Sequence, residues 1–305
     1  MPPVLVGGNP VAIPEVTMDV IASRIAAIGA TFSVISGLLL ISLIVYFRKW
    51  RNTAGRLLLC LFISDFIQSF STSLSYAWWS TGPQLGTTCN AQAWMQSIGD
   101  MASISALSNL AIHLLIAIFR GKHNSRLEVL AYITTFVIPI LFAGIGYAIY
   151  NRSDQPYWCW ISSEHPLARY IFFYLWVVIV FFVLLILYGT IIYRLSKRSV
   201  LQSNTLVNMK RNSTLRKMFG FPIVFLAVYA PIATVRIIVD LNRGRIQPPD
   251  WLVGTSTLVY SLSGFLNAVI YGMTRTKMFT KRTKEQSSRE RQIRSYGSYD
   301  NVQWE

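Results

Sequence analysis

Residues 171–193 read IFFYLWVVIVFFVLLILYGTIIY, an uninterrupted run without a charged side chain. A bilayer core about 30 Å thick requires roughly 20 mostly apolar residues for each crossing helix. Six further segments pass the same test. The sequence therefore predicts an all-α membrane protein, a seven-transmembrane helix bundle. Its predicted spans are 21–47, 57–79, 89–119, 128–150, 169–193, 217–238 and 251–271.

The composition of the 305 residues agrees with this prediction. Hydrophobic residues make up 53% and charged residues only 13%, whereas an average soluble domain carries about 25% charged residues. The net charge of +15 is confined to a few short segments. This pattern argues against a soluble enzyme, a disordered chain or a nucleic-acid-binding protein, whose basic residues share a surface with polar ones.

Motifs for catalysis and for metal binding are absent from the sequence. It contains no GxSxG or HExxH motif and no lysine in its last predicted span. Three cysteines are too few for a disulfide scaffold. The three histidines are too scattered to form a metal site; they are His113, His123 and His165. We therefore expect neither an enzyme nor a bound cofactor.

The basic residues predict the orientation, because cytoplasmic loops collect Lys and Arg. Most of the 28 Lys and Arg residues follow the first, third, fifth and seventh predicted spans, and the other loops contain no lysine. We expect an extracellular N-terminus (1–20), a transmembrane domain (21–272) and a cytoplasmic tail (273–305). The first twenty residues lack the positive segment of a cleaved signal peptide, so the first span is expected to direct insertion.

Two cysteines fall on the predicted outer side. Cys89 begins the third predicted span, and Cys159 lies in the loop between the fourth and fifth. An oxidising compartment favours a disulfide between them, and the alternative is two unrelated thiols. Asn151, Arg152 and Ser153 form a glycosylation sequon in the same loop.

Polar residues collect inside the second and third predicted spans, so we expect these helices to lie inside the bundle. Gln96, Asp100 and Ser103 share one face of the third helix because of their spacing. Asp65, Ser103 and Asn267 are expected to form one hydrogen-bonded cluster. Such a cluster is either a switch between two states or polar packing between helices, and the same two roles are open for Asp100.

Two prolines interrupt the sixth predicted span, Pro222 and Pro231. Each removes a backbone hydrogen bond and favours a kink. The helix is therefore predicted to hinge, and a static kink is the alternative.

Several motifs resemble those of G protein-coupled receptors. LFISD at 61–65 resembles their second-helix aspartate motif, and NAVIY at 267–271 resembles Asn-Pro-x-x-Tyr with alanine in place of proline. The latter resemblance adds Tyr271 to the expected interior switch. The Asp-Arg-Tyr motif is missing, and AIHLLIAIFR stands at 111–120 instead, so no ionic lock of the rhodopsin-like type is expected.

YWCWI at 157–161 is similar to an outer loop of the slime-mould cyclic-AMP receptors and their fungal relatives, including the glucose-sensing type. The run at 111–120 and the closing NAVIYG also resemble this group. The resemblance covers about residues 20–280. It implies a plasma-membrane receptor for an extracellular small-molecule or nutrient ligand, which activates a heterotrimeric G protein and feeds cyclic-AMP signalling.

Two surfaces are expected to carry this function. The ligand mouth is predicted at Gln96, Arg152, Trp158, Trp160, Arg169 and Arg243. The tryptophans have an alternative role as anchors at the membrane interface. The G-protein face is predicted at Arg120, Arg194, Lys197, Lys210, Arg211 and Arg216. Attraction to anionic membrane lipid is the alternative role of these basic residues.

The sequence leaves the ligand open among nucleotides, sugars, amino acids, lipids and peptides. A competing class is a seven-helix transporter or channel that uses Asp65 and Asp100 as ion or proton sites. No internal repeat is apparent in the sequence, which argues against a transporter built from duplicated halves.

Overall fold

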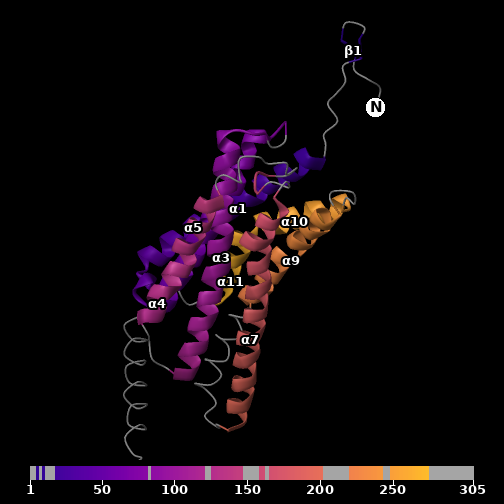
Figure 1. The fold of residues 1–305 in the computed structure, drawn as a ribbon. Coiled ribbons are helices and arrows are strands. Elements are labelled where there is room, and N and C mark those ends of the chain that lie inside the picture. Colours follow the sequence, from indigo (N-terminus) through magenta and orange to yellow (C-terminus); the bar gives the residue numbers. More distant parts are fainter. Residues whose placement is uncertain are drawn as a thin grey trace, which may run out of the picture.

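The computed structural model describes residues 5–6, 9–10, 18–81, 84–120, 125–146, 158–161, 165–201, 220–242 and 248–274. They form a bundle of long helices (Figure 1). The first part contains β1 (Leu5–Val6) and β2 (Asn9–Pro10), which pair antiparallel, then α1 (Met18–Tyr46), η1 (Lys49–Arg51), α2 (Thr53–Ser73) and η2 (Leu74–Trp78). The middle contains α3 (Thr87–Arg120), α4 (Ser125–Tyr132), η3 (Ile133–Val137) and α5 (Ile138–Gly146). The last part contains α6 (Pro166–Arg169), η4 (Tyr170–Tyr174), α7 (Leu175–Leu201), α9 (Gly220–Leu241), α10 (Asp250–Ser261) and α11 (Ser263–Thr274).

The number of spans agrees with the sequence prediction. Among the described residues, six helical segments are long and apolar enough to cross a membrane, and α10 with α11 gives a seventh. The second span begins at Thr53, one turn before the predicted start at residue 57. The cause is a cap, because the Asn52 side chain accepts a hydrogen bond from the Gly55 N–H at 2.6 Å.

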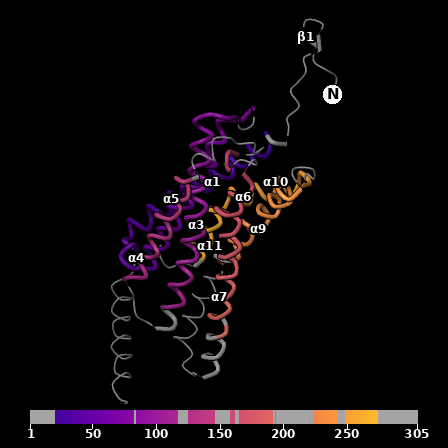
Figure 2. Tube along the Cα trace, viewed as in Figure 1, coloured from indigo at the N-terminus to yellow at the C-terminus, as the bar shows by residue number. Residues whose placement is uncertain are grey.

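Helix α3 is the centre of the bundle. It packs against α2, η3, α5 and α7, and the trace in Figure 2 shows it between α5 and α7. In the spans that contain α2 and α3, 61% of the residues in the apolar stretch are buried inside the protein. The corresponding share is 28% in the fourth and fifth spans. The two most polar spans are therefore inner helices, as the sequence predicted.

A glycine sets the close approach of α2 and α3. A Cβ atom added to Gly99 would lie 2.5 Å from the backbone nitrogen of Gln68. No side chain fits at that distance, so only glycine allows the two backbones to meet there. This contact brings the polar faces of the two helices together.

The seventh span, predicted at 251–271, is bent by 54° between α10 and α11. Serine and glycine residues weaken the helix at this point. Ser33 of α1 satisfies the interrupted backbone. Its hydroxyl donates to the Ser261 carbonyl at 2.8 Å and accepts from the Phe265 N–H at 3.1 Å. The bend is therefore held by a neighbouring helix.

Two short π-helical turns, η3 and η4, widen the fourth and fifth spans. The Asn109 amide of α3 holds the first, donating to the Ala131 carbonyl at 3.1 Å and to the Thr134 hydroxyl at 2.9 Å. The second turn contains the buried Phe173 and Tyr174. Turns of this type are frequent at functional sites.

The predicted hinge prolines differ in position. Pro231 lies in the interior of α9, and Pro222 falls in the first turn of that helix. Hinge motion of α9 stays a prediction.

Candidate functional site

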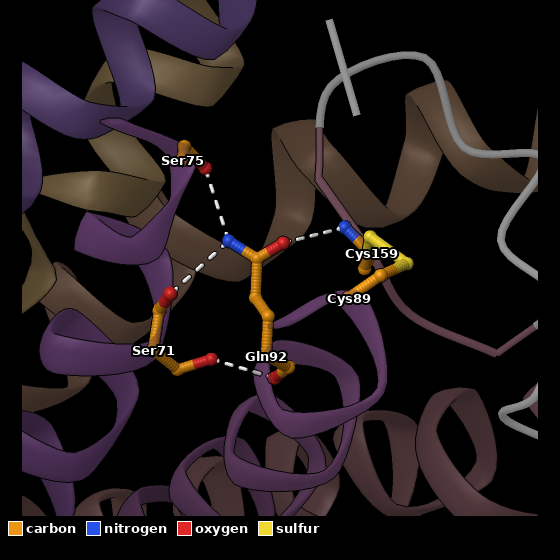
Figure 3. The surroundings of a disulfide bond; sticks show 5 residues. All are labelled: Ser71, Ser75, Cys89, Gln92 and Cys159. Atoms are coloured by element: carbon orange, nitrogen blue, oxygen red, sulfur yellow. Dashed lines mark hydrogen bonds between the residues drawn. A yellow bond between two sulfur atoms is a disulfide. The ribbon is translucent and has the colours of Figure 1, made fainter. Parts of the chain in front are cut away.

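The predicted disulfide is present. Cys89 of α3 bonds to Cys159, with their Cα atoms 5.2 Å apart. Gln92 adds a second connection (Figure 3): its side-chain oxygen accepts from the Cys159 N–H at 2.7 Å. Its amide nitrogen donates to the Ser71 carbonyl at 3.1 Å and to the Ser75 hydroxyl at 3.0 Å. The segment around Cys159 is thus fixed to both α2 and α3.

Gln92 was not among the site residues predicted from the sequence. It lies one helical turn before Gln96, on the same face of α3 as the predicted polar residues. Extending that face by one turn towards Cys89 would have found it.

The residues on either side of Cys159 are buried tryptophans. Trp158 stacks on Tyr260 of α10, with ring centroids 5.3 Å apart and an interplanar angle of 11°. Trp160 meets Phe173 of η4 edge-on at 5.1 Å. Both indoles therefore contribute to the interior of the bundle, which argues against the alternative of interface anchors.

A small cavity lies beneath this segment. Its wall comes from α3, residues 158–161, η4, α9 and α10. The lining residues are Asp100, Trp158, Trp160, Phe173, Tyr174, Ile232, Ala233, Arg236 and Tyr260. We call it the upper cavity. It combines one acidic and one basic side chain with aromatic and aliphatic walls.

Asp100 is the buried carboxylate of the upper cavity, with 1% of its surface exposed. The Tyr260 hydroxyl lies 2.7 Å from both carboxylate oxygens. The Gln96 amide lies 3.4 Å from each oxygen and also contacts the Tyr260 hydroxyl. The hydroxyl of Thr72 orients Gln96 by donating to its side-chain oxygen at 3.0 Å.

Two arginines, Arg169 and Arg236, lie on the same side of the molecule and have different contacts. Arg169 pairs with Asp240, and its Nε and Nη2 atoms donate to the Ile161 carbonyl at 3.0 and 2.9 Å. Arg236, one turn before Asp240 on α9, lines the upper cavity with its guanidinium 4.9 Å from the Trp158 ring centre. The predicted mouth residue Arg169 thus anchors the segment after Cys159, and Arg236 supplies the charge in the cavity.

A second polar cluster lies further along α3. The Ser103 hydroxyl donates to one oxygen of Asp65 at 2.6 Å, and the Asn267 amide donates to the other at 2.8 Å. The structure thus brings together the three residues that the sequence grouped. Tyr271, one turn beyond Asn267, packs edge-on against Phe62 at 5.4 Å. We call Asp65, Ser103 and Asn267 the lower cluster.

Several predicted residues lie outside the described part of the chain. For Arg120, Arg194 and Lys197 only the helical backbone is described, at the end of α3 and in α7. The other predicted residues outside the described ranges are Asn151, Arg152, Lys210, Arg211, Arg216 and Arg243.

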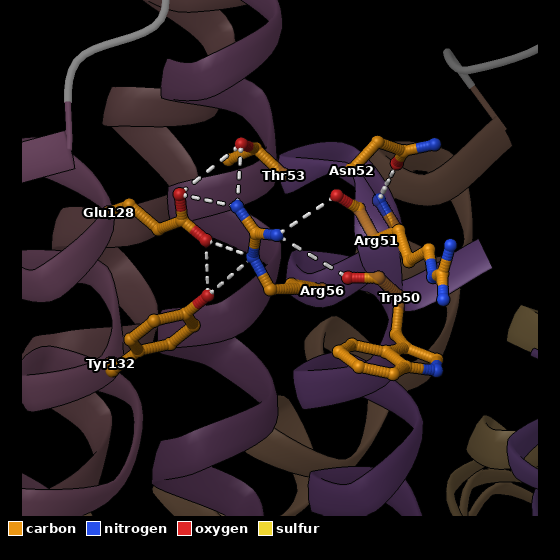
Figure 4. A network of polar contacts seen from close by, with 8 residues as sticks. Trp50, Arg51, Asn52, Thr53, Arg56, Glu128 and Tyr132 are labelled. Atoms are coloured by element: carbon orange, nitrogen blue, oxygen red, sulfur yellow. Dashed lines mark hydrogen bonds and ion pairs between the residues drawn. The ribbon is translucent and has the colours of Figure 1, made fainter. Parts of the chain in front are cut away.

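Arg56 follows the first predicted span and is one of the basic residues that predict the orientation. Figure 4 shows that it joins three elements, α2, α4 and η1. Its guanidinium pairs with Glu128 of α4, with one Nη2–Oε2 distance of 2.8 Å. It also donates to the Tyr132 hydroxyl at 3.1 Å and to the Arg51 carbonyl of η1 at 3.1 Å. This network fastens α4 to the start of α2, at the opposite end of α2 from the Gln92 contacts. The sequence offered one signal for this ion pair: Glu128 is an acidic residue at the start of the fourth predicted span.

The bundle, its bridged loop and the polar interior are those of a G protein-coupled receptor, and comparisons with known proteins agree. A sequence model of the family "Slime mold cyclic AMP receptor" matches residues 14–281. The chain therefore belongs to the slime mold cyclic AMP receptor family, as its motifs suggested. It is also 21% identical to the human (Homo sapiens) melatonin receptor type 1B over 277 residues, covering 82% of this chain and 74% of that receptor.

Proposed function

We propose that this chain is a plasma-membrane receptor that binds an extracellular small molecule in the upper cavity and activates a heterotrimeric G protein, feeding cyclic-AMP signalling. Its N-terminus lies outside and its C-terminal tail inside, because the basic loops collect on the cytoplasmic side. The upper cavity then lies towards the extracellular side.

One observation carries the proposal: α3 belongs to both polar sites. Asp100 lines the upper cavity, and Ser103, one turn further along the same helix, binds Asp65 in the lower cluster. A ligand that contacts Asp100 therefore acts on a helix that is hydrogen-bonded to α2 at the next turn. Through Asp65 the connection continues to Asn267 of α11.

Helix α9 is the element that we propose to move. Ile232 and Ala233 line the upper cavity directly after Pro231. Towards the other end of the helix, Val224 and Val228 of α9 line a second small cavity together with Ser103 and Asn267. A ligand that binds more tightly when α9 is displaced shifts the equilibrium towards that arrangement.

The basic residues of the predicted G-protein face would border the opening that this movement creates. The test is nucleotide exchange on the α subunit of candidate heterotrimers, with the wild-type receptor and a Lys210→Ala/Arg211→Ala/Arg216→Ala variant at equal surface expression. We expect exchange above background that falls in the variant. Equal exchange in both would place coupling elsewhere and leave these residues with their alternative role at the lipid surface.

A transporter would give a different result. Purified protein in proteoliposomes would then carry an ion or solute flux that is lost in Asp65→Asn, without any G protein. Such a flux, in the absence of nucleotide exchange, would contradict the proposed function.

A further inference from the structure

The connection between α1 and α2 carries a concentrated positive charge. It reads RKWR at 48–51, and the sequence contains no acidic residue between Asp19 and Asp65. Glu128 of α4, the acidic side chain that approaches this connection, pairs with Arg56 instead. We call residues 48–51 the basic turn. Its three cations, Arg48, Lys49 and Arg51, are thus not neutralised by that carboxylate.

The backbone of the basic turn is held in place. Arg48 has a left-handed conformation, with φ 53° and ψ 32°, directly before η1. The Arg56 guanidinium donates to the carbonyls of Trp50 and Arg51 at 3.4 and 3.1 Å, and the next residue, Asn52, caps α2. The backbone that carries the three cations is therefore ordered before a partner binds, which lowers the cost of binding.

The side chains of the basic turn are available to a partner. Arg48 and Arg51 are exposed, and Lys49 is half-buried. Trp50 is exposed as well, and so is Tyr46 at the end of α1. In Figure 4 the side chains of Trp50 and Arg51 point away from the ion pair between α2 and α4. Tryptophan and tyrosine are enriched at the headgroup level of a membrane, so the turn matches a lipid surface.

An exposed apolar face of α1 leads to the basic turn. Ile35, Leu38 and Val45 are exposed, and their spacing of three and seven residues places them on one side of the helix. Acyl chains can lie along this face while the headgroup of the same lipid contacts the turn. The two surfaces together therefore match both parts of an anionic lipid.

We propose that the basic turn binds a phosphoinositide, a lipid with a phosphorylated inositol headgroup, in the cytoplasmic leaflet. Arg48, Lys49 and Arg51 pair with the phosphates, Trp50 lies at the headgroup level, and the acyl chains follow α1. A guanidinium binds a phosphate with two parallel hydrogen bonds. The inference goes beyond the proposed function and takes from it only that the turn lies on the cytoplasmic side.

Other partners match this surface less well. Phosphatidylserine carries one net negative charge, whereas the turn presents three cations within four residues. An acidic surface of a G protein compensates the cations, but it leaves Trp50 and the apolar face of α1 without a role. A phosphoinositide uses the charges, the ring and the apolar face together.

The experiment compares ligands first. The purified full-length receptor in detergent micelles binds a fluorescent dioctanoyl phosphatidylinositol bisphosphate, measured by fluorescence anisotropy. The unlabelled lipid, dioctanoyl phosphatidylserine and free inositol trisphosphate then compete with it. Phosphatidylserine has fewer charges, and the free inositol phosphate lacks acyl chains. We expect the unlabelled phosphoinositide to displace the probe at concentrations about tenfold lower than either of the others.

A variant of the basic turn then locates the site. Arg48→Asn/Lys49→Gln/Arg51→Gln removes its three charges, and asparagine tolerates the left-handed backbone at position 48. Each basic residue near a membrane surface contributes about fivefold to the attraction of anionic lipid. The affinity for the fluorescent lipid is therefore expected to fall about a hundredfold, at an unchanged unfolding temperature.

Two further variants separate the turn from general positive charge and the lipid from its headgroup. Lys277→Gln/Lys281→Gln/Arg282→Gln removes an equal charge from the C-terminal tail and is expected to bind the lipid nearly as the wild type does. Trp50→Ala is expected to lose affinity for the lipid while it keeps its affinity for free inositol trisphosphate.

Three outcomes would overturn the inference: equal displacement by either competitor, unchanged affinity in the variant of the basic turn, or an equal loss in the tail variant. Nucleotide exchange on the G protein is measured in parallel. If the variant of the turn keeps its lipid affinity and loses exchange, the turn contacts the G protein and the inference fails. If the lipid binds as expected while the wild type gives no exchange, the inference stands and the proposed function fails.

Discussion

Asp100 and Asp65 are two buried aspartates on adjacent helices, each with 1% of its surface exposed, and they have different neighbours. Each oxygen of Asp65 accepts one short hydrogen bond, from Ser103 or Asn267. Within the described part of the chain, Asp100 has one close donor, Tyr260, and a longer contact from Gln96, and it borders the upper cavity. Asp65 is thus enclosed by protein, whereas the carboxylate oxygens of Asp100 can accept further hydrogen bonds on the side of the upper cavity.

This difference indicates a division of labour along α3. Under the proposed function, a ligand would contact Asp100 from the upper cavity, while Asp65 would respond to the packing of α2, α3 and α11. The following substitutions disturb both sites, then the upper cavity, then the bend between α10 and α11, and last the single bond between Tyr260 and Asp100.

The largest expected effect disturbs both sites at once. Gly99→Val places a side chain where the Gln68 backbone lies within 2.5 Å of a Cβ atom. Separating α2 from α3 is expected to cost about 3 kcal/mol of stability or more, measured as thermal unfolding and surface expression. Gly144→Ala is the control, since nothing lies within 4 Å of a Cβ atom there. Equal stability of the two variants would contradict the close contact.

Removal of the disulfide disturbs only the upper cavity. Cys89→Ala/Cys159→Ala is expected to lower stability by about 2–4 kcal/mol and to abolish ligand binding, because Trp158 and Trp160 lose their fixed position. Cys60→Ala, which removes the buried free thiol on α2, controls for the loss of a cysteine and should bind ligand normally. Ligand binding that persists without the bridge would show that Gln92 alone positions the segment.

The third substitution tests the bend between α10 and α11. Ser33→Ala removes both hydrogen bonds to the α10–α11 junction and is expected to cost about 2 kcal/mol, again measured by thermal unfolding. Ligand affinity should change little, because Ser33 lies outside the upper cavity. Ser36→Ala is the control: its hydroxyl donates to the Ser33 carbonyl within α1. A Ser33→Ala variant as stable as this control would show that another group satisfies the bend.

The smallest expected effect concerns Tyr260, which donates to Asp100 at 2.7 Å. Tyr260→Phe keeps the ring that stacks on Trp158 and removes the hydroxyl, at an expected cost of about 1 kcal/mol. Tyr76→Phe removes a hydroxyl that bonds to Thr31 in an exposed setting and should cost less. A thermal shift for Tyr76→Phe that exceeds the shift for Tyr260→Phe would argue against a stabilising role of the Tyr260–Asp100 bond.

Apolar runs of sufficient length predicted the spans, and the positions of polar residues within those spans predicted the group of Asp65, Ser103 and Asn267. Helical periodicity placed Asp100 and Ser103 on one face, yet they belong to separate polar sites. The reason is that one turn of α3 covers about 5.4 Å, enough to change the neighbours from Gln96 and Tyr260 to Asp65 and Asn267.

Features that depend on contacts between helices were not predictable from one helix at a time. The bend at Ser261 requires Ser33 of α1, and the pair of Arg56 with Glu128 requires α4 to lie beside α2. Arg169 was expected at the ligand mouth, but the nearness of Asp240 on α9 gives it a structural partner.

The most direct test of the division of labour compares Asp100→Asn with Asp65→Asn, each measured for ligand-independent nucleotide exchange on the G protein at equal surface expression. Our account predicts that Asp65→Asn loses this exchange, because the lower cluster connects α2, α3 and α11, whereas Asp100→Asn keeps it. Loss of exchange in Asp100→Asn while Asp65→Asn keeps it would contradict the account.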